Sequence, residues 1–276
     1  DSEQEKINDL QRIKKETNNI KVLEQEKIDE LNDKFDDYSS IEGFLNLKNF
    51  EKVSIISKSD IFKVYKIREK KTNEIYSAQI SLIQLDKLAR DDAIQLSKEV
   101  NIISQINHPS FLKFIGYSPV NFKNQRYPVI ATEFASNRSL KDILEMERKG
   151  ITITGWDETK KLINIYGIAS GMAYLHSKNI LLRNLNKDNI YLDDYLFPKI
   201  GDFGLSSKSY NIHSITFHST SGLKGNSAYL APELFGSNLY TKSSDVYAFS
   251  FIVFEILTNE IPFEDLINSN QLFIEI

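Results

Sequence analysis

The chain has 276 residues, a length that suits one large domain or two modest ones. Its hydrophobic content of 41%, with 11% aromatic residues, is enough for a packed core and excludes global disorder. The absence of cysteine excludes disulfides and thiolate metal sites and favours a reducing, cytoplasmic location. The net charge is −4, and no basic stripe predicts binding to nucleic acid or to an anionic membrane.

Residues 1–38 are predicted to form a charged amphipathic helix, because residues 2–38 contain neither glycine nor proline. Residues 1–40 carry 12 acidic and 7 basic side chains, so the rest of the chain has a net charge of +1. The last apolar residues of the segment share one side of a helix: Ile28, Leu31, Phe35 and Tyr38. This apolar seam is uninterrupted for about two heptads, whereas a coiled coil needs about three or four. Two interpretations stay open: a helix for self-association or partner binding, and a solvated brace on its own domain.

Residues 39–49 are predicted to be a linker, because they contain a Ser-Ser pair and a glycine. Five later segments rich in β-branched and aromatic residues are predicted to be strands: 50–57, 62–68, 74–81, 111–117 and 127–134. Three segments are predicted to be helices: 86–106, 159–176 and 247–257, the last apolar all round as expected of a buried helix. Strands early and helices late predict an α+β, two-lobed domain.

Two stretches in the second half of the chain carry chemistry. Residues 200–205 read Ile-Gly-Asp-Phe-Gly-Leu, and residues 182–189 read Leu-Arg-Asn-Leu-Asn-Lys-Asp-Asn. Asp-Phe-Gly after a strand is the metal-binding motif of protein kinases, whose preceding loop reads His-Arg-Asp-Leu-x-x-x-Asn. The frame and the final asparagine are kept, but Asn184 stands where that loop has its proton acceptor.

From about residue 48 onward the chain resembles the eukaryotic protein kinase domain, most closely the tyrosine-kinase-like branch of serine/threonine kinases. Seven motifs in register carry the resemblance: Glu99, Thr132-Glu133-Phe134, Trp156 to His176, Asp202-Phe203-Gly204, Ala231-Pro232-Glu233, Asp245 to Ser250 and Pro262-Phe263. The resemblance implies a kinase-like domain over residues 50–276. It would have a small β-rich lobe at about 50–134 and a helical lobe at about 135–276 that stops inside the family's helix G.

The loop that covers the phosphates in this family reads Gly-x-Gly-x-x-Gly-x-Val. Aligned on Val64, the three glycines are replaced by Ser57, Ser59 and Phe62. A Cβ blocks close approach of the backbone to phosphate, and the phenylalanine adds bulk. These replacements favour a plain β-turn over a nucleotide-binding loop.

The family's lysine on the third strand and its catalytic aspartate are both replaced by amides. Gln79 replaces the lysine and can still form a hydrogen bond with Glu99. It cannot neutralise phosphate charge, and this loss should lower the rate of transfer by about 10²–10³-fold. Asn184 has no basic lone pair near neutral pH, so general-base help of about 10²–10⁴-fold should be lost. Asn186 and Asn226 also replace the lysine and the threonine that brace the aspartate in the family.

The resemblance also implies the walls of a nucleotide pocket. Thr132 and Glu133 match the gatekeeper and the hinge, and Ser77 replaces the alanine of the ceiling. Tyr191 replaces the leucine that lies beneath the base. Its ring would partly fill the purine slot, unless it turns aside and packs on the helical lobe.

Both metal ligands of the family are kept, as Asn189 and Asp202, and their oxygens suit Mg²⁺. Two oxygens without nucleotide phosphates hold Mg²⁺ poorly, and Asp202 could instead cap a turn or pair with a cation. The resemblance therefore implies ATP and Mg²⁺, whereas the substitutions predict that neither is bound well.

Arg183 matches the arginine that, in regulated members of the family, pairs with a phosphate on the activation segment. That segment is rich in serine and threonine here. The composition fits a switch loop that becomes ordered when another kinase phosphorylates it. It also fits a polar flexible loop.

The leading hypothesis is a pseudokinase that binds a partner protein or another kinase, as a signalling scaffold or allosteric partner. The alternative is an active serine/threonine kinase with relocated groups, in which Lys63 reaches the phosphates and Asp188 acts as the base. A third hypothesis is a scaffold fragment that self-associates through residues 2–38.

Overall fold

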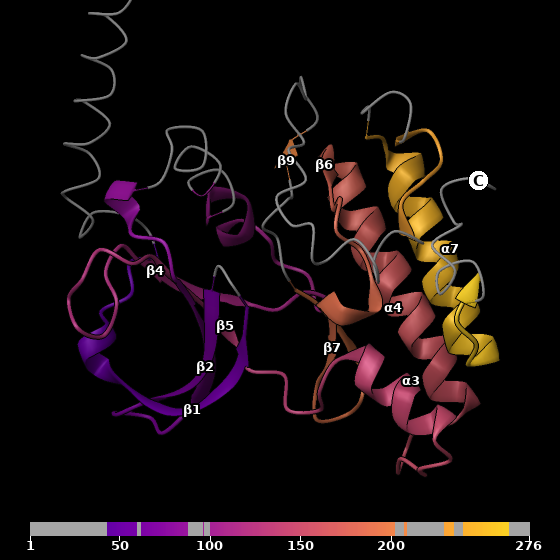
Figure 1. The fold of residues 1–276 in the computed structure, drawn as a ribbon, viewed down its shortest axis with the longest axis horizontal. Coiled ribbons are helices and arrows are strands. Elements are labelled where there is room, and N and C mark those ends of the chain that lie inside the picture. The colour runs from indigo at the N-terminus through magenta and orange to yellow at the C-terminus, as the bar shows by residue number, and fades with distance from the viewer. Residues whose placement is uncertain are drawn as a thin grey trace, which may run out of the picture.

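The computed structural model describes residues 43–59, 62–87, 96, 100–201, 207–208, 229–234 and 240–264. The helix predicted at residues 1–38 lies outside this part of the chain. Figure 1 shows a lobe built on a β-sheet beside a lobe built from helices. This arrangement confirms the α+β, two-lobed fold.

Five antiparallel strands form the sheet of the amino-terminal lobe, in the spatial order β1-β2-β3-β5-β4. Their bounds are β1 (Phe50–Lys58), β2 (Phe62–Glu69), β3 (Ile75–Ser81), β4 (Phe114–Ser118) and β5 (Val129–Glu133). All five strands were expected from the sequence, but β4 is shorter than residues 111–117. Phe111 belongs to the core of the helical lobe instead and forms only an isolated bridge with Ile200.

The strand register sorts the side chains of this sheet onto two faces. Ala78 lies opposite Tyr65, and both pack into the core of the sheet lobe. Gln79 lies opposite Val64 on one side and Ile130 on the other. Because Ile130 packs against the core of the helical lobe, the face that carries Gln79 is turned toward that lobe. We call it the inner face and the opposite one the outer face.

Part of the segment expected to be a linker packs against the sheet. The backbone N–H of Leu45 donates to Tyr117 O at 2.7 Å, and Phe44 forms a parallel bridge with Tyr117. Leu45 and Leu47 are buried in the core of the sheet lobe. Apolar side chains within this segment therefore fix residues 43–49 to the domain.

The helical lobe contains α3 (Leu140–Arg148), α4 (Glu158–Ser177) and α7 (Lys242–Thr258). Two short antiparallel pairs lie beside them: β6 (Ile180–Leu181) with β9 (Ser207–Lys208), and β7 (Ile190–Leu192) with β8 (Pro198–Ile200). Three 3₁₀ turns complete the described elements: Leu47–Asn49, Leu85–Lys87 and Lys187–Asn189.

The helix α4 agrees with the prediction at residues 159–176, whereas α3 was not expected. Its signal was present in the sequence, because Ser139 and Asp142 form a capping box at its amino end. Of the helix expected at residues 86–106, the described part begins as a 3₁₀ turn and is helical at residues 100–104.

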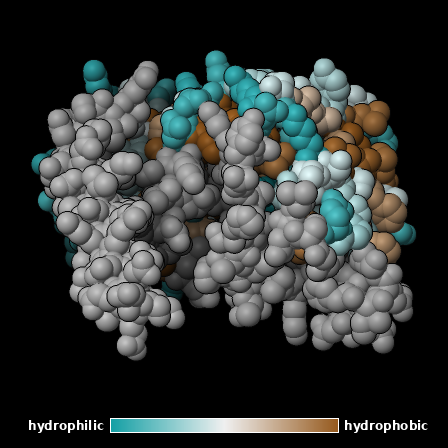
Figure 2. Space-filling view, turned by 90° about the horizontal axis from the view of Figure 1, so that it is seen from above, coloured by the Kyte–Doolittle hydropathy of each residue, from teal (hydrophilic) through white to brown (hydrophobic). Residues whose placement is uncertain are grey.

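The helix α7 corrects one expectation, because its all-round apolar surface is not buried all round. Ala248, Ile252 and Ile256 lie in the core of the helical lobe. On another face, Val246, Phe254 and Leu257 are 52%, 40% and 50% exposed. Figure 2 shows hydrophobic residues gathered at the end of the molecule where α7 lies in Figure 1. Among the described residues, no element covers this face, so its apolar character does not report burial.

His108 ties the segment before β4 to α4. Its Nδ1 accepts a hydrogen bond from the backbone N–H of Ser110 at 3.2 Å, and its Nε2 lies 3.2 Å from Ser170 Oγ. The Tyr174 ring covers the imidazole, with the ring centres 5.1 Å apart. This geometry requires a neutral ring, and burial lowers the pKa of His108.

We expect His108 to make stability depend on pH. The depressed pKa means that the unfolded chain binds the proton more readily, so this contribution is complete above about pH 6.5 and is lost as pH falls through the folded pKa. The difference in melting temperature between the wild type and His108→Gln should therefore become smaller as the pH is lowered from about 7.5 to 5.5. The other histidines contribute equally to both proteins and do not affect this difference. A difference in melting temperature that stays constant with pH would contradict the expectation.

Candidate functional site

The register brings together the side chains expected around a nucleotide. On the inner face, Ser57 lies opposite Val64, and Val64 lies opposite Gln79. Ser77 lies opposite Thr132 on the same face. The cluster thus combines hydroxyls, an amide and an aliphatic side chain, and none of these five residues is charged.

The two lysines of the central part of β2 lie on opposite faces. Lys63 pairs with Ile80, a core residue of the outer face, so it points away from the face that carries Gln79. Lys66 lies on the inner face, with its Nζ 4.6 Å from the centre of the Phe134 ring. A cation–π contact therefore holds this ammonium group beside the hinge.

The turn between β1 and β2 is closed by its own hydrogen bonds. The backbone N–H of Ser59 donates to Phe62 O at 2.9 Å, and the N–H of Phe62 donates to Ser59 Oγ at 3.2 Å. A phosphate-binding loop needs free backbone N–H groups, and these two are engaged within the turn. The geometry favours the interpretation of this segment as a β-turn.

A buried carboxylate on α7 holds the loop at residues 182–189. Asp245 is fully buried, and it accepts hydrogen bonds from Leu182 N at 3.0 Å and Arg183 N at 2.9 Å. His176 Nε2 lies 2.8 Å from the same carboxylate. Arg183 has a left-handed backbone with φ of 62°, a conformation that a non-glycine residue adopts only when its surroundings enforce it. The loop conformation therefore depends on Asp245.

A group of amides surrounds Asn184, the residue expected to stand in place of the family's proton acceptor. Asn186, which is 2% exposed, donates its Nδ2 to Asn184 Oδ1 at 3.1 Å. Asn186 Oδ1 accepts from the backbone N–H of Asp188 at 2.9 Å. The carboxamide oxygen of Asn184 is thus already an acceptor in a local network, in addition to being too weak a base for proton transfer.

Asp188, the residue considered as a substitute base, is paired with a cation. Lys141 Nζ on α3 lies 2.9 Å from Asp188 Oδ1, and this hydrogen bond raises the pKa of Lys141. Both side chains are about two-fifths exposed, at 42% and 40%, so the pair is worth little stability. The pair nevertheless directs the carboxylate of Asp188 toward α3.

The position of one predicted metal ligand is described. Asn189 donates its Nδ2 to Asn184 O at 3.0 Å, and its own backbone oxygen accepts from Gly201 N at 2.8 Å. The orientation leaves the Oδ1 of Asn189 as the atom available to a metal. Asp202 and Glu99 lie outside the described residues, as does the predicted contact between Gln79 and Glu99. Within the described part of the chain, no group of three or more His, Cys, Asp or Glu side chains is arranged to hold a metal.

The hinge is connected to the helical lobe by an ion pair. Lys199 Nζ on β8 lies 3.0 Å from Glu133 Oε1, without the angle of a hydrogen bond. The two side chains are 17% and 30% exposed, so the pair is partly shielded from solvent. Thr132, the predicted gatekeeper, donates its Oγ1 to Glu133 O at 3.3 Å.

The ring of Tyr191 packs against Gly201, the residue before the Asp-Phe-Gly motif. A Cβ at position 201 would lie 2.9 Å from Tyr191 Cε2 and 2.8 Å from Leu112 Cδ1. The ring therefore occupies space that a side chain at position 201 would need. This contact fits the interpretation in which Tyr191 packs on the helical lobe.

Gly201→Ala is expected to lower the free energy of unfolding by about 1–3 kcal/mol, because overpacking forces neighbours off their rotamers. Tyr191→Leu should relieve part of this cost, so a double-mutant cycle by urea unfolding should give a coupling above about 0.5 kcal/mol. If Gly201→Ala destabilised the wild type and the Tyr191→Leu variant equally, Leu112 alone would restrict the space at position 201.

The guanidinium of Arg183 is partly buried, and it forms no ion pair with a carboxylate within the described residues, although the charge of Asp245 acts on it. Its Nε and Nη2 are buried and have no hydrogen-bond partner in the part of the chain that the structure describes, and burial lowers the pKa of the group. The Tyr240 ring centre lies 6.0 Å from its Cζ. These donors are the ones expected to meet a phosphate, but residues 209–228 of the activation segment lie outside the described part.

Glu255 connects this loop to two other segments of the helical lobe. The side chain is 1% exposed and lies 3.3 Å from Arg148 Nη2. Lys187 and the hydroxyl of Tyr229 also contact its carboxylate. Burial and this carboxylate raise the pKa of Tyr229 far above its usual value. Two cations and a hydroxyl thus satisfy a charge that could not otherwise be buried.

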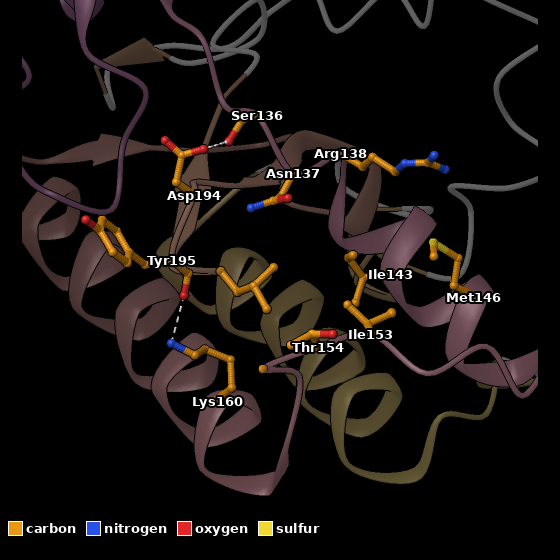
Figure 3. A pocket seen from close by; sticks show the side chains of 12 residues that line it. Ser136, Asn137, Arg138, Ile143, Met146, Ile153, Thr154, Lys160, Asp194 and Tyr195 are labelled. Carbon is orange, nitrogen blue, oxygen red and sulfur yellow. Dashed lines mark hydrogen bonds between the residues drawn. The ribbon is translucent and has the colours of Figure 1, made fainter.

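A pocket of about 420 Å³ lies elsewhere in the helical lobe (Figure 3). Its walls come from residues 136–138, α3, residues 153–155, the start of α4 and the β7–β8 turn. None of the residues expected to bind nucleotide or metal lines it. Its volume alone gives no reason to assign it to the nucleotide.

The sheet lobe, the helical lobe and the loop anchored by Asp245 define a protein kinase fold. The family model of the protein kinase domain matches residues 50–276, so the chain belongs to this family. It is 30% identical to the receptor-like kinase LIP2 of Arabidopsis thaliana, over 76% of this chain and 37% of that protein. It is 27% identical to the serine/threonine-protein kinase polo of Drosophila melanogaster, over 79% of this chain and 35% of that protein.

A third relative, the probable L-type lectin-domain containing receptor kinase S.5 of Arabidopsis thaliana, is 31% identical over 63% of this chain. The match covers 26% of that protein, and the chain therefore spans between about a quarter and two-fifths of these three relatives. In the part of this chain that the structure describes, no helix is both long enough and apolar enough to cross a membrane.

Several residues with clear roles in the geometry were not singled out from the sequence. Asp245 was recognised only as part of a motif, and Lys141, Lys199 and Glu255 gave no signal of their own. Each acts through a partner far away in the chain, and charged residues are too common for a pairing to be read from spacing. Asn186 caps the 3₁₀ turn at residues 187–189, a local signal that the sequence offered but that was not used.

Proposed function

We propose that this chain contains a pseudokinase domain, which acts by binding a protein partner or another kinase and not by transferring phosphate. One observation carries the proposal: amides, Gln79 and Asn184, stand at the two positions where phosphoryl transfer needs a cation and a base. The affiliation with the tyrosine-kinase-like branch and the cytoplasmic location belong to the same proposal.

The geometry supports loss of the chemistry over its relocation. Lys63 points to the outer face, away from Gln79. Asp188 is paired with Lys141. Neither residue is therefore placed to replace the group that is missing.

The described residues fit a bound Mg-ATP poorly. The turn at Ser59 and Phe62 uses its own N–H groups, and Gln79 offers no positive charge to phosphates. Lys66, a cation on the inner face, is held against Phe134. Asn189 retains one oxygen suited to Mg²⁺, which is too little to hold the ion without phosphates. We therefore propose that partner binding does not depend on nucleotide.

The second candidate is an active serine/threonine kinase, since the relatives named above are kinases. A transfer assay with radiolabelled ATP, Mg²⁺ and the full chain distinguishes the two. We expect no incorporation above that of Asp202→Ala, and no thermal shift at millimolar Mg-ATP. Turnover that Asp202→Ala abolishes would overturn the proposal in favour of the active enzyme.

A further inference from the structure

The pocket in Figure 3 is built on a rigid frame. The segment after β5 is fixed to the β7–β8 hairpin, because Asn137 N donates to Leu192 O at 3.0 Å and Leu192 N donates to Arg138 O at 3.1 Å. Asp193 Oδ1 accepts from the backbone N–H groups of Tyr195 and Phe197, both at 2.9 Å, which closes the turn. A preformed pocket loses little entropy when it binds a ligand.

Two non-glycine residues that line the pocket have left-handed backbones. Arg138 has φ of 54° and Leu196 has φ of 59°. Such a conformation costs roughly 1–2 kcal/mol for each residue, and strain of this kind is often found at binding sites. The side chain of Leu196 is 7% exposed and packs with Ile143, which gives the pocket an apolar floor.

The charges at the pocket leave a positive excess. Asp194 already accepts a hydrogen bond from Ser136. Lys160 Nζ donates to Tyr195 O at 2.8 Å and lies 4.2 Å from the centre of the Phe197 ring, and no carboxylate of the described residues forms an ion pair with it. The side chain of Arg138 is exposed, and its guanidinium makes no ion pair or hydrogen bond with any residue the structure describes. Figure 3 shows Arg138 and Tyr195 at opposite ends of the pocket.

An exposed apolar strip adjoins the pocket at the β7–β8 turn and the first turns of α4. Tyr195 is 74% exposed, Phe197 is 40% exposed, and their ring centres are 6.3 Å apart. Ile163, 36% exposed, lies one turn after Lys160 on α4. Exposed tyrosine and phenylalanine beside a pocket are typical of the residues that dominate protein–protein binding energy. The strip extends beyond what a small molecule in the pocket would cover.

We propose that this pocket and strip bind an extended peptide of a partner protein, with an aliphatic side chain on the apolar floor and a neighbouring Asp or Glu on Arg138. The inference rests on the proposed function, since it names the surface through which the domain would bind a partner. It commits to an acidic-aliphatic peptide because, among the described residues, two cations of the pocket form no ion pair with a carboxylate, and because its floor is apolar.

The test is selection of a displayed random peptide library on the full chain, followed by fluorescence anisotropy of an enriched peptide. We expect enrichment of an aliphatic residue next to Asp or Glu. Arg138→Glu should weaken binding of the peptide at least about tenfold. A library selected on this variant should be enriched in Lys or Arg in place of Asp or Glu. Thr154→Trp, at an exposed lining position, should fill the pocket and also weaken the peptide at least about tenfold.

Lys178→Glu is the matched control, because Lys178 is an exposed cation over a single ring, Tyr174, away from the pocket. It should leave binding unchanged. The proposal is overturned if the library shows no such enrichment, or if the peptide binds all three variants as well as the wild type. Self-association of the wild type in sedimentation that Thr154→Trp abolishes would also overturn it, in favour of a second copy. The kinase assay tests the proposed function separately, so the two can fail independently.

Discussion

Asp245→Ala is expected to destabilise the domain by about 3–5 kcal/mol, because two buried backbone N–H groups lose their acceptor and His176 loses its carboxylate. The left-handed backbone of Arg183 would lose the contact that enforces it. For a domain of this size, the melting temperature should fall by at least about 6 °C in a thermal unfolding scan.

Asp193→Ala provides a matched control for this change. Asp193 also accepts two backbone hydrogen bonds, from Tyr195 and Phe197, but it does so in a solvent-exposed turn. Water can replace the lost acceptor there, so the expected cost is about 1 kcal/mol or less. If the two variants melted at the same temperature, burial of Asp245 would not be the source of its effect.

The combined variant Gln79→Lys, Asn184→Asp is expected to gain phosphate transfer. It restores a cation on the inner face and a carboxylate that can still accept the hydrogen bond from Asn186. Each single variant should stay at background, whereas the double should exceed it by about 10²-fold or more in a radiolabelled ATP assay. The same double variant with Asp202→Ala should return to background.

A wild type that already matches the double variant would contradict the pseudokinase proposal. A silent double variant would contradict only this prediction. It would show that the turn closed by Ser59 and Phe62 limits phosphate binding even when both charges are present.

The strands and long helices could be predicted because their signals are local. Segments rich in β-branched and aromatic residues predicted β1 to β3 within a residue or two, and the predicted bounds of α4 agree equally well. The burial of α7 was predicted less well, since an apolar helix surface does not say which faces other elements cover. The same limit applies to Leu45 and Leu47, whose burial depends on the position of the sheet.

For the candidate site, the sequence identified the substitutions, and the structure decided which of the proposed compensations are geometrically reasonable. Lys63 and Lys66 are three residues apart on one strand, yet only the register shows that Lys66 shares the face of Gln79. Asp188 looked like a spare carboxylate until α3 placed Lys141 beside it.

Residue identity alone determined that Gln79 and Asn184 are uncharged, because a carboxamide is neutral in any conformation. Tertiary structure alone decided which charges meet: Lys141 with Asp188, Lys199 with Glu133, and Arg148 with Glu255. Ion pairs and pockets form between segments that are distant in sequence, and their distances follow from packing and not from local propensity.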